Sequence, residues 1–93
     1  MAQDSDNNGK LSAGELGQAA LTTVQELTGY EPEAVTSLMW DGDFWQVTVD
    51  ALELARIPNT TDVLGTYVVQ LDEGGTLHGY RRERRYVRGQ AEA

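Results

Sequence analysis

The sequence contains no cysteine and one histidine, His78. The absence of cysteine excludes disulfide bonds, thiolate zinc sites and cysteine nucleophiles, and a single histidine excludes a metal centre held by several histidines. No unbroken apolar run exceeds four residues, so we expect no membrane-spanning segment. The polar first ten residues lack the basic and apolar parts of a secretion signal. The lack of cysteine suits a reducing cytosol without proving one.

Basic residues are scarce over most of the chain. Residues 1–76 hold 13 acidic and two basic residues, a net charge of -11, whereas residues 77–93 hold five arginines and two glutamates, a net charge of +3. The whole chain has a formal net charge of -8. Most of the molecule therefore repels polyanions, while the short C-terminal segment could attract them or acidic proteins.

A length of 93 residues favours one domain. We expect an acidic, flexible lead-in at residues 1–11 and a single domain at 12–90. Ser12 and Glu15 have the spacing of a capping box at a helix start. Apolar residues then recur at steps of three and four and form one stripe, which predicts a helix over 12–28 that ends at Gly29. The members of this stripe are Ala13, Leu16, Ala20, Val24 and Leu27.

After Pro32 the apolar pattern changes to a period of two, which predicts strands at 35–40, 44–54, 63–71 and 76–87. Leu52 and Leu54 break the alternation, which predicts either a bulge near 50–52 or a sheet that is covered on both faces there. Short turns separate the strands, and residues 89–93 are expected to fray. Because short connections favour antiparallel neighbours, the predicted fold is α+β, with one N-terminal helix packed on a four-stranded antiparallel β-meander.

The segment from Asp4 to Glu15 fits the calcium loop of an EF-hand, with oxygen-bearing residues at the ligand positions and Gly9 at the sharp turn. The alternative is an acidic linker that runs into a capped helix, because the capping box alone accounts for Ser12 and Glu15. A calcium-responsive protein is therefore one hypothesis, although no metal site is assigned.

Arginine and tyrosine alternate in the segment Tyr80–Arg88. In a regular strand one face would hold Tyr80, Arg82, Arg84, Tyr86 and Arg88. Three interpretations are open. The guanidinium groups could pair with carboxylates of the same chain such as Glu53, Asp62 or Asp72, they could form a protein interface, or they could bind nucleic acid. The acidic body of the chain disfavours nucleic acid.

The loop from Arg56 to Asp62 is a second candidate recognition element, since it is polar and contains a proline between two strands. The alternative is an ordinary turn in which Asp62 or Thr60 binds nearby backbone N–H groups. No serine, histidine or carboxylate lies in a catalytic sequence context. We therefore expect no enzyme activity and no cofactor.

Two segments resemble the gas vesicle protein O family. These are ELTGYEPEAVTSL at 26–38 and RIPNTTDVLGTYVVQLDEGGTLHGYRRERRYVRGQ at 56–90. The resemblance covers about residues 12–90 and leaves the acidic segment at 4–10 outside. It implies a cytoplasmic accessory protein that is needed to form gas vesicles and associates with them, with other gas vesicle proteins as partners and no membrane partner. It transfers no catalytic residues.

Together these observations predict a protein interaction module, with a nucleic-acid-binding regulator of vesicle genes and a calcium-responsive accessory protein as alternatives. The candidate partner-binding residues lie in the loop and the arginine-rich strand: Ile57, Asn59, Thr60, Asp62, Tyr80, Arg82, Arg84, Arg85, Tyr86 and Arg88.

Overall fold

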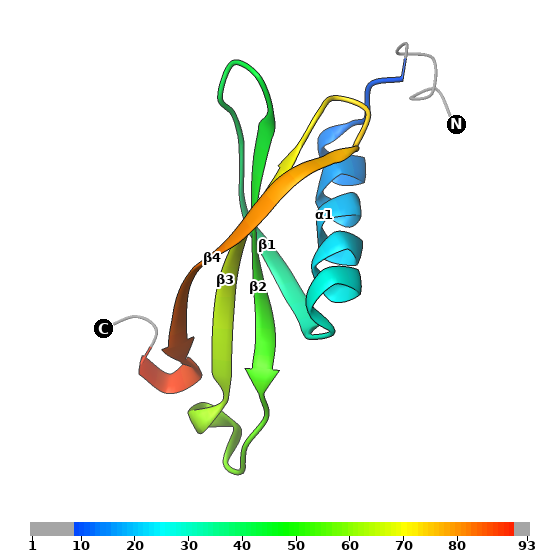
Figure 1. Cartoon of the computed structure of the whole chain (residues 1–93). Helices are drawn as coiled ribbons and strands as arrows, with labels where there is room; N and C mark the ends of the chain where they lie inside the picture. Colours follow the sequence, from blue (N-terminus) through cyan, green and yellow to red (C-terminus); the bar gives the residue numbers. More distant parts are fainter. Residues whose placement is uncertain (1–8, 91–93) are drawn as a thin grey trace.

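The computed structural model describes residues 9–90 and shows one helix beside a twisted sheet (Figure 1). The strands form one antiparallel sheet in the order β1-β2-β3-β4, which confirms the predicted α+β meander. In chain order the elements are α1 (Ala13–Thr28), β1 (Glu31–Trp40), β2 (Trp45–Leu54), the 3₁₀ helix η2 (Asn59–Thr61), β3 (Val63–Leu71), β4 (Leu77–Val87) and the 3₁₀ helix η3 (Arg88–Gln90).

Both predicted ends of α1 are confirmed. Ser12 Oγ accepts the Glu15 N–H at 3.1 Å, and the Glu15 carboxylate accepts the Ser12 N–H at 2.8 Å, so the capping box is complete. Gly29 ends the helix with φ 78°, a left-handed conformation that glycine adopts at little cost. The stripe prediction is wrong at both of its ends. Ala13 is exposed in the first turn, and Leu27, in the last turn beyond the buried Val24, is 45% exposed.

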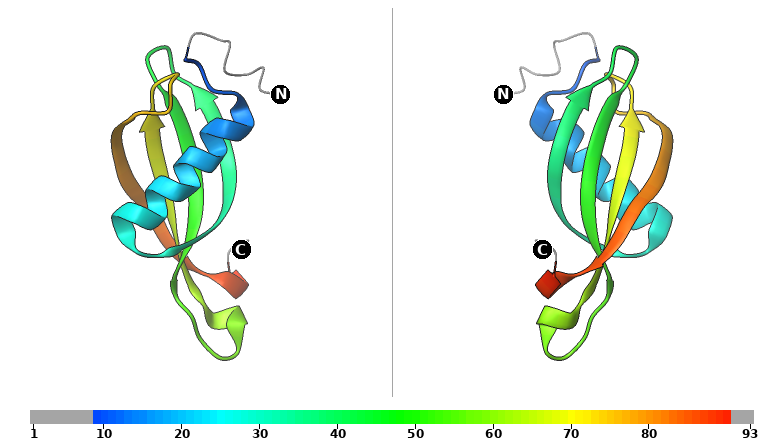
Figure 2. Two further views of the ribbon diagram at one scale, coloured as in Figure 1. Left: turned by 90° about the vertical axis from the view of Figure 1, so that its right-hand side faces the viewer. Right: turned by 90° about the vertical axis from the view of Figure 1, so that its left-hand side faces the viewer.

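The hydrophobic core lies between α1 and one face of the sheet. Figure 2 shows the helix crossing this face diagonally, while the opposite face has no helix over it. The helix contributes Leu16, Ala20 and Val24, and the sheet contributes alternate residues of β2 and β3, since successive side chains of a strand point to opposite faces. The buried sheet residues of this cluster are Val47, Val49, Ala51, Tyr67, Val69 and Leu71.

Three strands begin at a different residue from the prediction, β1 by four residues and β2 and β4 by one residue each. β1 begins at Glu31 and so includes Pro32, which an edge strand tolerates because the missing N–H need not pair. Residues 88–90 form η3 instead of fraying, since the Arg88 N–H donates to the Asp62 carbonyl at 2.8 Å. The bulge expected near 50–52 lies between Leu52 and Leu54, so Glu53 is the extra residue.

The molecule is elongated, with extents of 46 × 27 × 23 Å. The β2–β3 end of the sheet extends past the end of α1, so α1 does not cover the loop that carries η2 (Figure 1). None of the helices within residues 9–90 is long and apolar enough to cross a membrane.

Candidate protein-binding surfaces

A bulge divides the arginine-rich strand β4 between the two faces of the sheet. Arg82 pairs with Tyr67 of β3, whereas Arg84 pairs with Thr66, so Glu83 is an extra residue. Adjacent residues of β3 point to opposite faces, and Arg82 and Arg84 therefore do so as well. The prediction that Tyr80, Arg82, Arg84, Tyr86 and Arg88 share one face is thus wrong, because a regular alternation was assumed through the bulge.

On the helix side of the sheet, Arg82 and Arg85 share the carboxylate of Glu53. Arg82 Nη1 and Arg85 Nε lie 3.0 Å and 3.1 Å from Glu53 Oε1, and the Tyr67 hydroxyl donates to Glu53 Oε2 at 2.6 Å. The Glu53 side chain is only 1% exposed. Burial, followed by the contact with Glu53, raises the pKa of the Tyr67 phenol above its ordinary value of 10.0. This cluster joins β2, β3 and β4.

Gly65 provides the space that Glu53 occupies. A Cβ at position 65 would lie 2.8 Å from the Glu53 carboxyl carbon and 3.0 Å from a ring carbon of Tyr67. Both distances are shorter than van der Waals contact, so a larger residue would displace the carboxylate from its cluster.

Arg88 connects the end of β4 to β1 and to the η2 loop. Its Nη2 lies 2.7 Å from Glu33 Oε2, and its Nε donates to Asp62 Oδ2 at 3.1 Å. The carboxylates of Glu33 and then Asp62 raise the pKa of the Arg88 guanidinium. Asp62 also accepts the Arg56 N–H at 2.8 Å, and this hydrogen bond is the main reason why the pKa of the Asp62 carboxyl lies below its ordinary 3.8.

These contacts confirm internal pairing for Arg82, Arg85 and Arg88, and with it the predicted partners Glu53 and Asp62. Asp72 pairs with a histidine instead of an arginine: His78 Nε2 lies 2.9 Å from Asp72 Oδ2, in the β3–β4 turn.

The η2 loop holds an exposed isoleucine on a braced backbone. Ile57 is 100% exposed, and the residue after it is Pro58, whose carbonyl accepts the Thr61 hydroxyl at 2.7 Å. Asn59 and Thr60 are exposed in η2, where Gly89 packs so closely that a Cβ there would lie 2.9 Å from the Thr60 carbonyl oxygen. Of the four loop candidates, only Asp62 is buried, and it supports the loop from inside.

On the face without a helix, fewer carboxylates neutralise the charge of the arginines. Among the described residues, neither Arg81 nor Arg84 forms an ion pair. Arg84 lies over the Tyr86 ring, 4.6 Å from its centroid, and the Tyr86 hydroxyl donates to Asp50 Oδ2 at 2.9 Å. Burial and then this hydrogen bond raise the pKa of the Tyr86 phenol. Tyr80 lies on the helix side and is 44% exposed.

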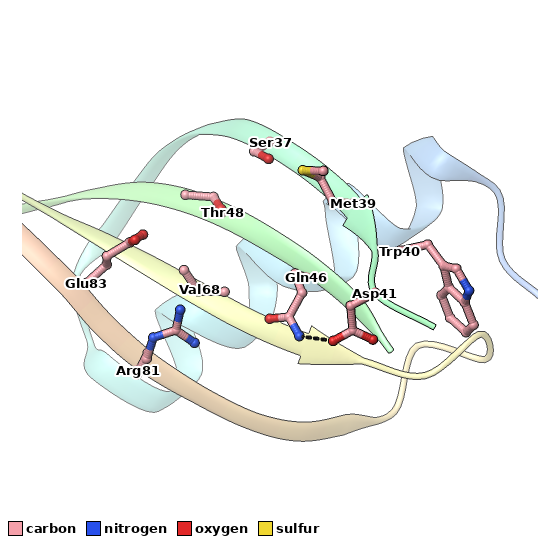
Figure 3. A pocket seen from close by; sticks show the side chains of 9 residues that line it. All are labelled: Ser37, Met39, Trp40, Asp41, Gln46, Thr48, Val68, Arg81 and Glu83. Atoms are coloured by element: carbon pink, nitrogen blue, oxygen red, sulfur yellow. Dashed lines mark hydrogen bonds between the residues drawn. The ribbon is translucent and has the colours of Figure 1, made fainter. Parts of the chain in front are cut away.

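A shallow groove of about 460 Å³ lies beside Arg81 on this face. Figure 3 shows Arg81 and Glu83 of β4 along one side and Met39 of β1 along the other, with Val68 of β3 and Thr48 of β2 between them. At one end the Gln46 amide donates to Asp41 Oδ2 at 2.6 Å. The complete lining is Ser37, Met39, Trp40, Asp41, Gln46, Thr48, Val68, Arg81 and Glu83.

The sequence did not predict this groove, because its residues come from all four strands and only the strand register places them together. It also did not single out Glu33, Asp50 or Gly65. The one signal for Gly65 is a glycine inside an otherwise regular strand, which is typical of a close approach by a neighbouring group.

The proposed calcium loop is described only from Gly9 onward. Its position-12 residue, Glu15, uses its carboxylate to accept the Ser12 N–H, as the capping-box alternative requires. The residues at 4–8 lie outside the described part of the chain. Within residues 9–90, no group of three or more histidine, aspartate or glutamate side chains could hold a metal ion.

Comparisons with known proteins give a consistent family. Residues 1–92 match the family described as "Gas vesicle synthesis protein GvpO", so the match includes the acidic segment that the resemblance left outside. Gas vesicle protein O of Streptomyces sp. (strain CB03234) is 47% identical over 75 residues, which cover 81% of this chain and 59% of that protein. No solved structure matches the chain.

Two archaeal relatives extend the comparison. Gas vesicle protein O of Haloferax mediterranei is 35% identical over 71 residues, which cover 75% of this chain and 51% of that protein. Gas vesicle protein O1 of Halobacterium salinarum is 30% identical over 70 residues, which cover 75% of this chain and 59% of that protein. The matched part thus spans between 51% and 59% of each relative's length. With the family match over residues 1–92, these likenesses show that the chain belongs to the gas vesicle protein O family.

Proposed function

We propose that this protein is a non-enzymatic accessory factor for gas vesicle formation, which acts in the cytoplasm by binding other gas vesicle proteins during shell assembly. Family membership supports a role in gas vesicle synthesis. The observation that carries the binding role is the fully exposed side chain of Ile57 on a loop that the rest of the fold holds in place.

The bracing of this loop favours binding. The Asp62 carboxylate joins the two ends of the loop, because it accepts a hydrogen bond from the Arg56 N–H, and it attaches the loop to the end of β4, because it also accepts one from the Arg88 guanidinium. Arg88 is in turn held by Glu33 of β1. A loop that is already ordered loses less conformational entropy when a partner binds. More of the free energy gained by burying an apolar side chain at its tip therefore remains as affinity.

Polar side chains that are buried or half-buried support a non-enzymatic role. Glu53, Asp50 and Asp62 each accept hydrogen bonds that connect different strands or the loop. These groups hold the sheet and its projecting end together, as expected for a rigid binding scaffold.

The test replaces Ile57 with aspartate in a strain that forms gas vesicles and whose own gene for this protein has been deleted. Gas vesicles are counted by electron microscopy, and co-purified gas vesicle proteins are identified by mass spectrometry. We expect Ile57→Asp to reduce both by at least tenfold while circular dichroism and Tm stay unchanged, because a fully exposed side chain contributes little to folding.

Gln18→Glu is the matched control, since it also adds one negative charge at an exposed position, on α1. We expect this variant to support normal vesicle formation. Normal vesicles and normal co-purification in Ile57→Asp would contradict binding through the loop. Normal vesicles in the deletion strain without any complementing gene would contradict the proposed function itself.

A further inference from the structure

The β4 bulge places two guanidinium groups that form no ion pair within residues 9–90 in a row on the face of the sheet without a helix. Arg81 pairs with Val68 and Arg84 with Thr66. Because Val68 and Thr66 are two residues apart on one strand, they point to the same face and stand about 7 Å apart. The two arginines therefore have the spacing of alternate residues on an extended chain, although they are three residues apart in the sequence.

The groove beside this row adds apolar surface. Arg81 lines the groove together with Val68 and Met39, and Met39 is 63% exposed. Ser37 lies at the level of Arg81 in the strand register, because both belong to the row that also contains Thr48 and Val68. Met39 is two residues further along β1 and points to the same face as Ser37. Along the strand direction Arg84, Arg81 and Met39 thus lie at successive levels, with Met39 on β1 at the opposite edge of the sheet from β4. Figure 3 shows Arg81 and Met39 on the two sides of the groove, which also holds the carboxylates of Asp41 and Glu83.

We propose that this face binds an extended acidic segment of a partner polypeptide. Two carboxylates placed two residues apart pair with Arg81 and Arg84, and an apolar side chain two residues further along enters the groove beyond Val68, toward Met39. Charge complementarity carries the choice of partner, because these guanidinium groups have no ion pair among the described residues of an otherwise acidic chain.

A polypeptide fits this surface better than a nucleic acid. The Tyr86 ring is covered by Arg84 and its hydroxyl is bonded to Asp50, so it offers no open platform on which a base could stack. The net charge of -8 repels a dense row of phosphates, whereas a peptide can place apolar side chains between its carboxylates and so match the groove.

The inference rests on the proposed function only for the identity of the partner as a gas vesicle protein. Peptide binding itself is measured on the purified full chain. The probe is a synthetic peptide, Ser-Leu-Ser-Glu-Ser-Glu-Ser, blocked at both ends, and its counterpart has glutamine at both glutamate positions. Isothermal calorimetry in low salt compares the two. We expect saturable binding of the acidic peptide with a Kd below about 1 mM, weaker binding in high salt, and none of the glutamine peptide.

Arg81→Gln with Arg84→Gln should weaken binding about tenfold, because two charge-assisted contacts are lost, and Met39→Gln should weaken it about threefold. The matched control is Lys10→Gln with Arg56→Gln, which removes the same charge from exposed positions outside β4 and should bind like the unchanged protein.

Three outcomes would overturn the inference. The first is that the β4 double variant and its control bind the peptide equally well, and the second is that a single-stranded RNA 12-mer binds more tightly than the peptide. The third is that the peptide fails to bind while sedimentation velocity shows a dimer of this chain that dissociates in the Arg81/Arg84 variant. Because the assay contains no gas vesicle proteins, a failure here leaves the Ile57 experiment to decide the proposed function separately.

Discussion

Glu53 illustrates how a single bulge residue determines which interactions the neighbouring arginines form. As the extra residue of β2, it points its carboxylate to the helix side of the sheet, where two guanidinium groups and a phenol contact it. A carboxylate that is 1% exposed requires such partners, because an unpaired buried charge is costly. Arg82 and Arg85 are therefore occupied with the fold, in spite of their exposed position on an edge strand.

The space beside Gly65 gives a direct test of this cluster. Gly65→Ala should lower the free energy of unfolding by about 2 to 3 kcal/mol, because the new methyl group overlaps the Glu53 carboxylate and separates it from its partners. Urea denaturation followed by tryptophan fluorescence measures the loss.

Gly14→Ala serves as the comparison for this substitution. A Cβ there would lie 4.0 Å from its nearest neighbour, Ser12 Oγ, and the position is helical, so we expect no loss and a gain of up to about 1 kcal/mol. Equal effects at the two positions would show that Gly65 does not hold space for Glu53.

At the scale of elements, the fold followed from local patterns. The Ser12–Glu15 box and Gly29 set the bounds of α1, and the alternation of apolar residues in 63–71 matches β3. The bulges were harder to predict, because a strand tolerates an extra residue wherever its neighbours allow it. The shift at Leu52 and Leu54 left a visible break in the apolar pattern, whereas β4 has too few apolar residues to reveal its own bulge.

The candidate site was predictable only in part for the same reason. Sequence reasoning found the arginines and two of their carboxylate partners, Glu53 and Asp62. It could not divide the arginines between the two faces, since that division depends on the register of β3 with β4. Glu33 was also missed, because it lies far from Arg88 in the sequence and meets it only at the end of the folded sheet.

The η2 loop and η3 depend on the charge of Asp62, and this dependence predicts an effect of pH. The folded-state pKa of Asp62 lies below its ordinary 3.8, so its contribution to stability is present above about pH 4 and is lost as the pH falls through the folded-state value. The difference in stability between the unchanged protein and Asp62→Asn should therefore be constant from pH 7 to 5 and shrink below pH 4.

Hydrogen exchange gives a local measure of the same contact. The Arg56 N–H donates to Asp62, and its exchange should become faster in Asp62→Asn at pH 6, while the Gly29 N–H, which closes α1, should exchange as before. A stability difference that grows toward low pH, or unchanged exchange at Arg56, would contradict the role of the Asp62 carboxylate in bracing the loop.

At the scale of the whole molecule, the charges separate into two functions. On the helix side of the sheet, Arg82 and Arg85 neutralise a buried carboxylate, and Arg88 attaches the projecting end of the sheet to β1. On the opposite face, Arg81 and Arg84 are the residues proposed to bind an acidic segment of a partner. The two surfaces that we propose for partners are the Ile57 loop at one end of this acidic molecule and the face of the sheet without a helix.

This division is tested most directly by comparing the free energy of unfolding of two double variants that remove the same charge from the same strand. Arg82→Gln with Arg85→Gln should lose about 2 kcal/mol, because Glu53 remains buried without its cations, and the half-exposed guanidinium groups keep the loss below that of a fully buried pair. Arg81→Gln with Arg84→Gln should lose less than about 1 kcal/mol. Equal losses, or a larger loss from the Arg81 and Arg84 variant, would contradict the division of β4 into structural and partner-binding arginines.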